Sequence, residues 1–227
     1  KMKLNKIALA LFAVTAAPLA ANAGVTISPL LLGYHYSEGA DDDQVDVMGD
    51  GSGNGFYKED GLYTGAALGI ELTPSTQFQV EYGVSDANGE ASEDSAKSGA
   101  NRFDIEQEMI SGNFLIGTEE FTGYTDNALK PYVLIGAGQS KIEVENQEEY
   151  QDSNGNTVAA GTEVSNSKDT IGNLGLGAMY RINDALSLRG EARAIHNFDN
   201  NWWEGMALAG LEVVLGGHLK PTVAVPP

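Results

Sequence analysis

The chain has 227 residues, of which 42% are hydrophobic, 28 are Gly and none is Cys. The absence of cysteine excludes disulfide scaffolds and thiolate metal sites, and this length allows one or two domains. Lys and Arg number 13 against 32 Asp and Glu, which gives a net charge of −19 that would repel a polyanion. No run of Lys or Arg offers a local basic patch, so we expect no nucleic-acid partner.

The first part of the chain, residues 1–23, has the pattern of a secretory signal peptide. It begins with basic residues, continues with an apolar stretch over 7–19, and ends in the small residues of an Ala-x-Ala cleavage site. A retained transmembrane anchor is the alternative, but the apolar stretch is short for a bilayer. We therefore expect export, with cleavage after Ala23.

The rest of the chain is dominated by segments in which apolar residues recur with a period of two, which is typical of half-buried strands. We expect eight such strands, at about 25–37, 61–73, 76–86, 101–118, 131–145, 168–182, 185–198 and 203–215. The connections between them alternate between short turns and mostly long polar loops. This alternation is typical of outer-membrane barrels, which have short periplasmic turns and longer extracellular loops.

The two faces of the expected strands differ in charge. One face runs from Leu30 and Leu32 to Val213 and Leu215 and contains no Asp, Glu, Lys or Arg. A charge at the lipid midplane would cost roughly 2 to 4 kcal/mol, so a charge-free face is what insertion requires. The pattern favours an all-β, eight-stranded antiparallel up-and-down transmembrane β-barrel. A soluble sandwich or a lipocalin-like barrel is the alternative.

The opposite face carries charges and many glycines and would point into the barrel. At eight strands the interior is only wide enough for side chains to fill it, so opposed charges there should pair. We predict an interior ion-pair network of seven residues: Glu71, Glu81, Arg181, Arg189, Glu191, Arg193 and Glu212. Large side chains on the same face, including Leu31, Leu115 and Leu134, indicate a plugged barrel.

Aromatic residues lie near several strand ends, where the ring would meet the membrane interface. We predict an aromatic girdle with seven members: Tyr34, Tyr36, Tyr63, Tyr132, Tyr180, Trp202 and Trp203.

Several stretches of sequence together resemble the N-terminal barrel of the outer membrane protein A (OmpA) family. They are GAALGIELTP at 65–74, YVLIGAG at 132–138, LGLGAMY at 174–180, NDALSLRGEAR at 183–193 and ALAGLEVVLGG at 207–217. The resemblance covers about residues 24–217. It implies a monomeric outer-membrane barrel followed by a Pro-rich linker and a periplasmic domain that binds peptidoglycan. Residues 218–227 resemble the start of that linker, and the C-terminal domain is absent from this sequence.

The resemblance also implies slow diffusion through an interior ion-pair gate. Arg189 falls where the family's gating arginine would lie, and Glu191 follows it on the same face. Gln79, Asn113 and Met179 stand where charged partners would be expected, so the gate differs from the family's. We therefore expect Arg189 and Arg193 to pair with Glu81 and Glu191. Arg181 would pair with Glu71 and Glu212.

Other motifs admit two interpretations. The DGSGNG stretch at 50–55 resembles half of an EF-hand loop, but Gly61 stands where a bidentate Glu is needed, so an acidic surface loop is favoured. The three His residues show no ligand spacing, so we expect no metal and no cofactor. His35 and Ser37 share a strand face, which a lipid-deacylating enzyme could use, but no orienting acid is identifiable.

These observations predict a non-enzymatic outer-membrane protein that supports envelope integrity. Its partners would be membrane lipids and lipopolysaccharide, with peptidoglycan bound only through the missing domain. One alternative is a narrow, low-conductance ion channel gated by interior ion pairs. The other is an emulsifying or adhesive surface protein that contacts cells or hydrophobic interfaces through its loops.

Overall fold

The computed structural model of the protein describes residues 24–37, 56–91, 103–123, 125–126, 128–151 and 155–220. The predicted signal peptide and the EF-hand-like stretch at 50–55 lie outside the described residues, as do 221–227 of the predicted linker.

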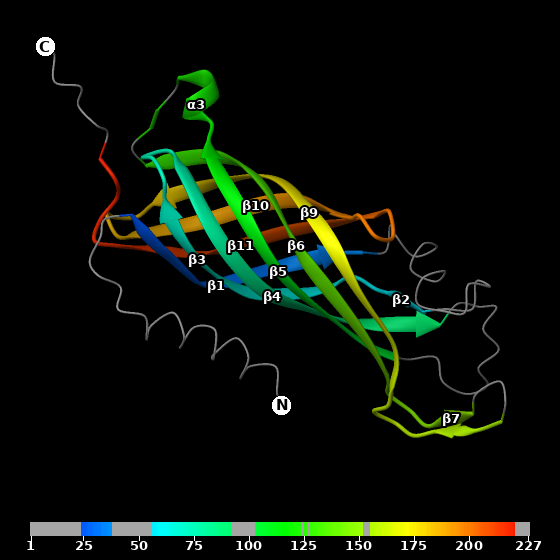
Figure 1. Ribbon diagram of the computed structural model, residues 1–227. Helices are drawn as coiled ribbons and strands as arrows, with labels where there is room; N and C mark the ends of the chain where they lie inside the picture. Colours follow the sequence, from blue (N-terminus) through cyan, green and yellow to red (C-terminus); the bar gives the residue numbers. More distant parts are fainter. Residues whose placement is uncertain are drawn as a thin grey trace, which may run out of the picture.

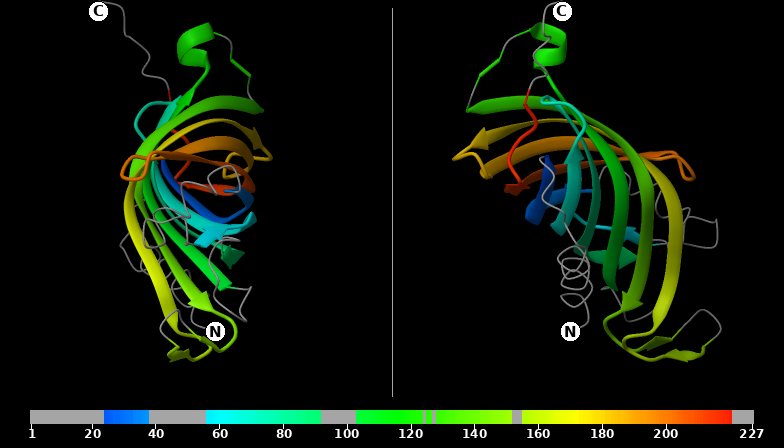
Figure 2. Two further views of the ribbon diagram at one scale, coloured as in Figure 1. Left: turned by 90° about the vertical axis from the view of Figure 1, so that its right-hand side faces the viewer. Right: turned by 60° about the vertical axis from the view of Figure 1, so that its left-hand side comes forward.

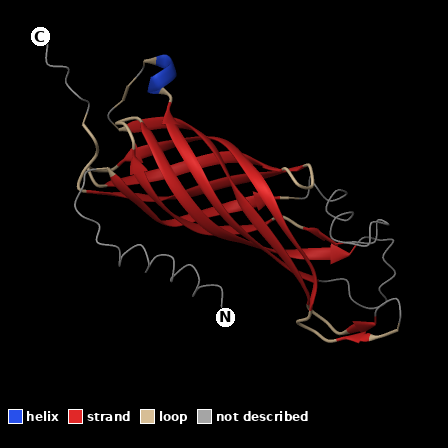
Figure 3. Ribbon diagram, in the orientation of Figure 1, coloured by secondary structure: helices blue, strands red, loops and turns tan. Residues whose placement is uncertain are grey.

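Within the described residues, eight long antiparallel strands form a closed barrel (Figures 1 and 3). They are β1 (Val25–Tyr36), β3 (Gly61–Glu71), β4 (Thr76–Ala91), β5 (Phe103–Gly117), β6 (Leu129–Asn146), β9 (Glu163–Arg181), β10 (Leu186–Asn197) and β11 (Trp202–Leu215). Hydrogen-bonded neighbours run in the order β4-β3-β1-β11-β10-β9-β6-β5, and pairing of β5 with β4 closes the ring. The predicted fold class is confirmed.

Shorter elements lie at the two ends of the barrel. Strand β2 (Phe56–Lys58) pairs with the end of β4, and β7 (Tyr150–Gln151) pairs with β8 (Thr157–Val158). A single turn of helix, α3 (Glu119–Thr122), lies between β5 and β6. In the part of the chain that the structure describes, no helix is long and apolar enough to cross a membrane.

One end of the barrel, which we call the turn end, carries tight connections shaped by polar side chains. Thr73 Oγ1 accepts hydrogen bonds from the backbone N–H groups of Ser75 and Thr76. Asn183 Oδ1 does the same for Ala185 and Leu186. Such side chains supply the acceptors that a reversing backbone needs. Helix α3 and the exit of the chain after β11 lie at the same end (Figure 1).

The opposite end, the loop end, is extended on one side only. Strands β4, β5, β6 and β9 run further than their neighbours, so that the barrel continues as a curved sheet (Figure 2). The extension includes residues that the sequence suggested were loop, because β4 continues past residue 86 and β9 begins at residue 163 rather than 168.

The polarity of the two faces inverts along these longer strands. Toward the turn end, outward residues such as Ile110 and Ile135 are about half exposed, and many inward residues are polar. Toward the loop end, β5 and β6 instead point charged residues such as Glu145 outward. Their inward residues there are apolar and fully buried, and they form a separate cluster with Trp202: Phe103, Ile105, Ile142 and Val144. We call the outward apolar residues toward the turn end the apolar band. The separate buried cluster stabilises the extension beyond this band.

Candidate functional site

A buried cluster of four charged residues crosses the barrel interior, and we call it the ion layer: Glu81, Arg189, Glu191 and Arg193. Arg193 binds Glu81 bidentately, with Nη1 and Nη2 at 2.9 and 3.0 Å from the two carboxylate oxygens. Its Nε donates to Glu191 Oε1 at 2.6 Å. Arg189 Nη2 lies 2.7 Å from Glu191 Oε2 and 4.0 Å from Glu81 Oε2. All four side chains are at most 3% exposed.

Two buried tyrosines complete the ion layer. Tyr63 donates its hydroxyl proton to Glu81 Oε1 at 2.6 Å, and Tyr132 donates to Glu191 Oε2 at the same distance. Arg189 Nε in turn donates to the Tyr132 hydroxyl oxygen at 3.0 Å. Each carboxylate is thus held by one tyrosine and by at least one arginine. Satisfied hydrogen bonds of this kind make buried charges tolerable.

The neutral residue Gln79 is also part of the arrangement. Its Oε1 accepts a hydrogen bond from Arg189 Nη1 at 3.0 Å. Gln79 therefore stands in as an acceptor where the family resemblance led us to look for a charge. Asn113 and Met179 are the other two neutral residues at positions where the resemblance led us to expect charges. Asn113 accepts a hydrogen bond from Asn173, and Met179 packs against the apolar cluster around Leu134.

The second predicted set, Arg181 with Glu71 and Glu212, is not joined by direct ion pairs among the described residues. Arg181 Nη2 instead approaches His218 Nδ1 at 3.4 Å, and His218 contacts Glu71. Glu212 accepts a hydrogen bond from Gln77 Nε2 at 3.0 Å. The prediction of an Arg181 ion pair was wrong, because His218, which follows the last strand, lies between the two charges.

The aromatic girdle also needs correction. Tyr34, Tyr36, Tyr180 and Trp203 lie on the outer face and are 48 to 58% exposed. Tyr63, Tyr132 and Trp202 are instead at most 4% exposed, because each lies on the inward parity of its strand. Position near a strand end suggested the interface for these three, but strand parity decides which side a ring takes.

Glycines make room for the interior rings. A Cβ added at Gly83 would overlap the Tyr63 ring, and one added at Gly177 would lie 2.5 Å from the Tyr132 ring. Both glycines lie on strands next to the tyrosine that they accommodate. The glycine-rich stretches therefore serve close packing of backbone and ring.

Nearer the loop end, His35 lies in a second polar cluster. Its Nδ1 is 2.9 Å from Ser85 Oγ, and its Nε2 is 3.5 Å from Glu204 Oε1. The hydroxyl of Ser37, its candidate partner, donates to the Glu59 carbonyl at 3.3 Å. His35, Ser85 and Glu204 are at most 3% exposed. Ser37 is fully buried as well, so neither serine hydroxyl near His35 is exposed to solvent.

At the turn end, Asp126 shapes the long connection before β6. Its Oδ1 accepts backbone hydrogen bonds from Leu129 at 2.8 Å and Ala128 at 2.7 Å. These hydrogen bonds, that from Leu129 foremost, hold the pKa of the Asp126 carboxyl below its usual value. Among the residues with described positions, no group of three or more His, Asp or Glu side chains is arranged to hold a metal ion.

Sequence reasoning missed the roles of Tyr63, Tyr132 and Gln79. Parity places all three on the inward face, and that signal was available. What the sequence could not supply is how closure of the barrel brings β4 and β10 face to face, so that Arg193 reaches Glu81 although the two strands are not neighbours in the sheet.

Comparison with known proteins agrees with this architecture. Residues 7–214 match the sequence model of the outer membrane protein beta-barrel domain. Outer membrane protein Omp38 of Acinetobacter baumannii, from two strains, is 46% identical over 226 residues. That match covers 99% of this chain and 57% of Omp38.

The solved structures add a fold match. Neisserial surface protein A has a TM-score of 0.53 at 12% identity, covering 84% of this chain and 96% of that one. At this identity the likeness concerns the fold alone. The family match spans most of the chain, and the chain therefore belongs to the outer membrane protein beta-barrel domain family, whose members lie in the outer membrane.

Proposed function

We propose that this chain is a structural outer-membrane barrel with a closed interior. The observation that carries the proposal is the ion layer: both carboxylates, both guanidinium groups and both tyrosine hydroxyls are engaged within the barrel. Leu31 and Leu134, which are fully buried, fill further parts of the interior. A filled interior stabilises the barrel wall and leaves little space for solutes.

We propose the following orientation and contacts for the barrel in the membrane. The turn end faces the periplasm and the loop end faces outward, as short turns and long loops suggest. The exposed apolar band contacts lipid acyl chains, and the outer tyrosines and Trp203 lie at the interfaces. We further propose membership of the OmpA group, a monomeric state, signal-peptide cleavage after Ala23 and contact with lipopolysaccharide. The chain spans 57% of the length of Omp38. We propose no peptidoglycan contact for the barrel itself, because the OmpA resemblance assigns that contact to a periplasmic domain.

An envelope assay tests the structural role. In cells that lack the protein, we expect increased uptake of a hydrophobic dye, restored by the wild-type gene. A variant in which Glu81 and Glu191 become Gln and Arg189 and Arg193 become Met should restore the barrier equally if it folds, because scaffolding needs the barrel and not its charges. Folding is checked by the gel mobility shift between boiled and unboiled samples. Failure of the folded variant to restore the barrier would contradict a purely structural role.

A narrow channel is the second candidate. The observation in its favour is that Arg189 lies between two carboxylates, at 2.7 Å from Glu191 and 4.0 Å from Glu81. A small rotation of the guanidinium would exchange one partner for the other and change the free space beside it. Under this alternative, Gln79→Ala should raise the bilayer current, because it removes an acceptor that holds Arg189.

The third candidate is adhesive or emulsifying activity at the loop end. The extension of β5 and β6 beyond the apolar band favours this candidate. The outer faces of these strands carry charged residues there, and their inner faces pack in a separate buried cluster. Removing residues 147–162, which connect β6 to β9, should abolish surface binding and leave membrane insertion intact. Binding that survives this deletion would exclude the connection between β6 and β9 as the contact site.

A further inference from the structure

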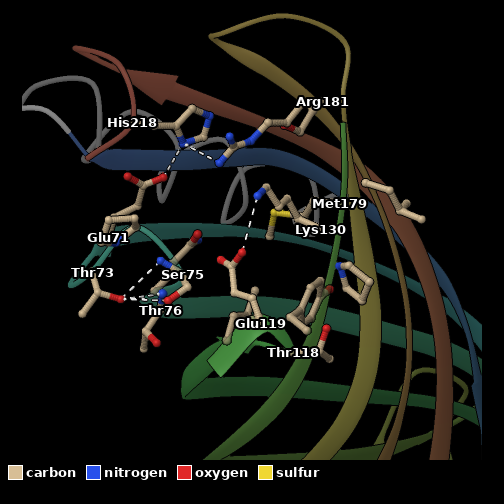
Figure 4. A pocket seen from close by; sticks show the side chains of 18 of the residues that line it. Glu71, Thr73, Ser75, Thr76, Thr118, Glu119, Lys130, Met179, Arg181 and His218 are labelled. Atoms are coloured by element: carbon tan, nitrogen blue, oxygen red, sulfur yellow. Dashed lines mark hydrogen bonds and ion pairs between the residues drawn. The ribbon is translucent and has the colours of Figure 1, made fainter. Parts of the chain in front are cut away.

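A pocket of about 60 Å³ lies at the turn end of the barrel (Figure 4). Leu115, Tyr132 and Met179 line it, and the same three residues belong to the apolar cluster around Leu134. Glu212 and other polar groups also line the pocket. Because Tyr132 also binds the ion layer, this pocket lies between the ion layer and the turn end.

The chain leaves β11 beside this pocket, and His218 is one of the residues that line it. Gly216 and Gly217 have φ values of 72° and 82°, a conformation that glycine adopts easily and that turns the chain sharply. The Gly217 carbonyl then accepts a hydrogen bond from the backbone N–H of Gly24 at 2.8 Å. The exit segment, which we define as residues 216–220, is therefore fastened to the start of β1.

A single carboxylate holds the next two residues. Leu219 donates its backbone N–H to Glu71 Oε2 at 2.7 Å, and His218 Nδ1 contacts Glu71 Oε1. The Glu71 side chain is 8% exposed and that of His218 is 18% exposed. Both oxygens of one nearly buried carboxylate thus bind the exit segment. Loss of these contacts would leave a nearly buried charge without its hydrogen-bond partners, which is energetically unfavourable.

Arg181 approaches the same ring nitrogen of His218 that contacts Glu71, as Figure 4 shows. Its Nη2 lies 3.4 Å from His218 Nδ1, which already serves Glu71. One ring nitrogen cannot donate to a carboxylate and accept from a guanidinium together, so the shorter Glu71 contact is the one that holds the ring. Arg181 adds positive charge beside a carboxylate that it does not reach.

We propose that the exit segment is a latch that closes the turn-end pocket, with Glu71 as its catch. Lifting of His218 from Glu71 would expose Glu212 and the neighbouring Ser187, which both line the pocket and are each 2% exposed. The ion layer would stay closed behind Tyr132. The latch goes beyond the structural role proposed above and holds whether or not the ion layer conducts.

Thiol reactivity tests the latch, because the chain contains no cysteine of its own. Ser187→Cys places a reporter in the pocket, and the full chain in detergent micelles is treated with a charged methanethiosulfonate reagent. Adding Glu71→Ala should raise the modification rate about tenfold or more, which corresponds to about 1.4 kcal/mol of lost closing free energy. His218→Ala should act in the same direction.

Two controls separate opening of the latch from general loosening. Glu119→Ala removes a carboxylate that lines the same pocket but pairs with Lys130 at 3.6 Å, and it should leave the Ser187→Cys rate unchanged. A second reporter, Ser140→Cys, is fully buried on β6 nearer the loop end and should stay protected in every background. Equal Ser187→Cys rates with and without Glu71, or reactivity of the Ser140→Cys reporter with Glu71→Ala, would overturn the proposal.

Discussion

At the scale of single residues, the interior is organised by tyrosines that hold carboxylates. The hydroxyls of Tyr63 and Tyr132 are buried and each donates to a glutamate of the ion layer. A buried carboxylate that loses a donor keeps its desolvation cost. The tyrosines therefore stabilise charges that the arginines alone would leave partly unsatisfied.

Replacing either tyrosine by phenylalanine tests this. We expect Tyr63→Phe and Tyr132→Phe each to lower the free energy of unfolding by about 1 to 3 kcal/mol. The measurement is denaturant unfolding in lipid vesicles, followed by the gel mobility shift. Tyr180→Phe, on the exposed outer face, is the matched control and should be nearly neutral. A loss at Tyr180 equal to the loss inside would refute the assignment.

Glycines beside these rings give a second residue-scale prediction. Gly83→Ala forces a methyl group into the Tyr63 ring, so it should destabilise the barrel by about 1 to 3 kcal/mol. Gly190 lies on the outer face of β10, where an added Cβ meets nothing within 4 Å. Gly190→Ala should therefore leave stability unchanged or raise it slightly in the same unfolding assay. Equal effects at the two glycines would contradict close packing at Gly83.

Asp126 supplies a prediction about pH. Its pKa is lowered in the folded protein, so its stabilising effect is present above the ordinary aspartate pKa of about 3.9 and is lost as the pH falls through the lower folded value. A carboxyl-shift NMR titration in micelles should place the midpoint below about 3.9. At neutral pH, Asp126→Ala should speed amide exchange of Ala128 and Leu129. A midpoint at or above the ordinary value would show that these hydrogen bonds do not form.

At the scale of elements, each long strand carries two environments. On β6, the outward residue Ile135 belongs to the apolar band and is 51% exposed. Glu143 points to the same side of the same strand, but it lies beyond the band, where Lys141 contacts it. The change from apolar to charged outer residues marks where the strand leaves the lipid.

Two arginine substitutions on this strand locate the boundary. Ile135→Arg should lower stability by about 2 to 4 kcal/mol in lipid vesicles, since the charge enters the hydrocarbon. Glu143→Arg should cost little, because that position meets water. Unfolding in vesicles measures both variants. Similar costs at the two positions would place the boundary elsewhere on β6.

The strands also show what sequence alone could predict. Period-two alternation predicted the barrel strands and their outward faces, because burial on one side is a local property of each strand. The extension of β9 to residue 163 was missed, since its polar sequence in isolation resembles a loop. Its ordering comes from pairing with β6 and from the cluster around Trp202, which are contacts between segments far apart in the chain.

The candidate site divides in the same way. The charges of the ion layer were predictable as an inward set, because strand parity and the presence of both acidic and basic residues on one face can be read from the sequence. The inward position of Trp202 was not, because the predicted strand began at residue 203 and β11 begins at Trp202. The interposition of His218 between Arg181 and Glu71 depends on the path of the chain after β11, which two left-handed glycines determine.

At the scale of the whole molecule, the strands form a membrane-spanning wall around an interior that side chains fill. Polar groups in the interior bind each other, and apolar clusters lie on either side of the ion layer. We propose that such an interior resists both collapse and the passage of solutes, so that the folded barrel is closed.

Planar-bilayer recording tests that claim most directly. The protein is first shown to be folded by its gel mobility shift and is then inserted into a bilayer under an applied voltage. We predict no stable current steps for the wild type and steps of measurable size for Arg189→Ala, which removes the guanidinium that links Gln79, Tyr132 and Glu191. Regular ohmic steps from the folded wild-type barrel would contradict the closed interior and make the channel the leading function.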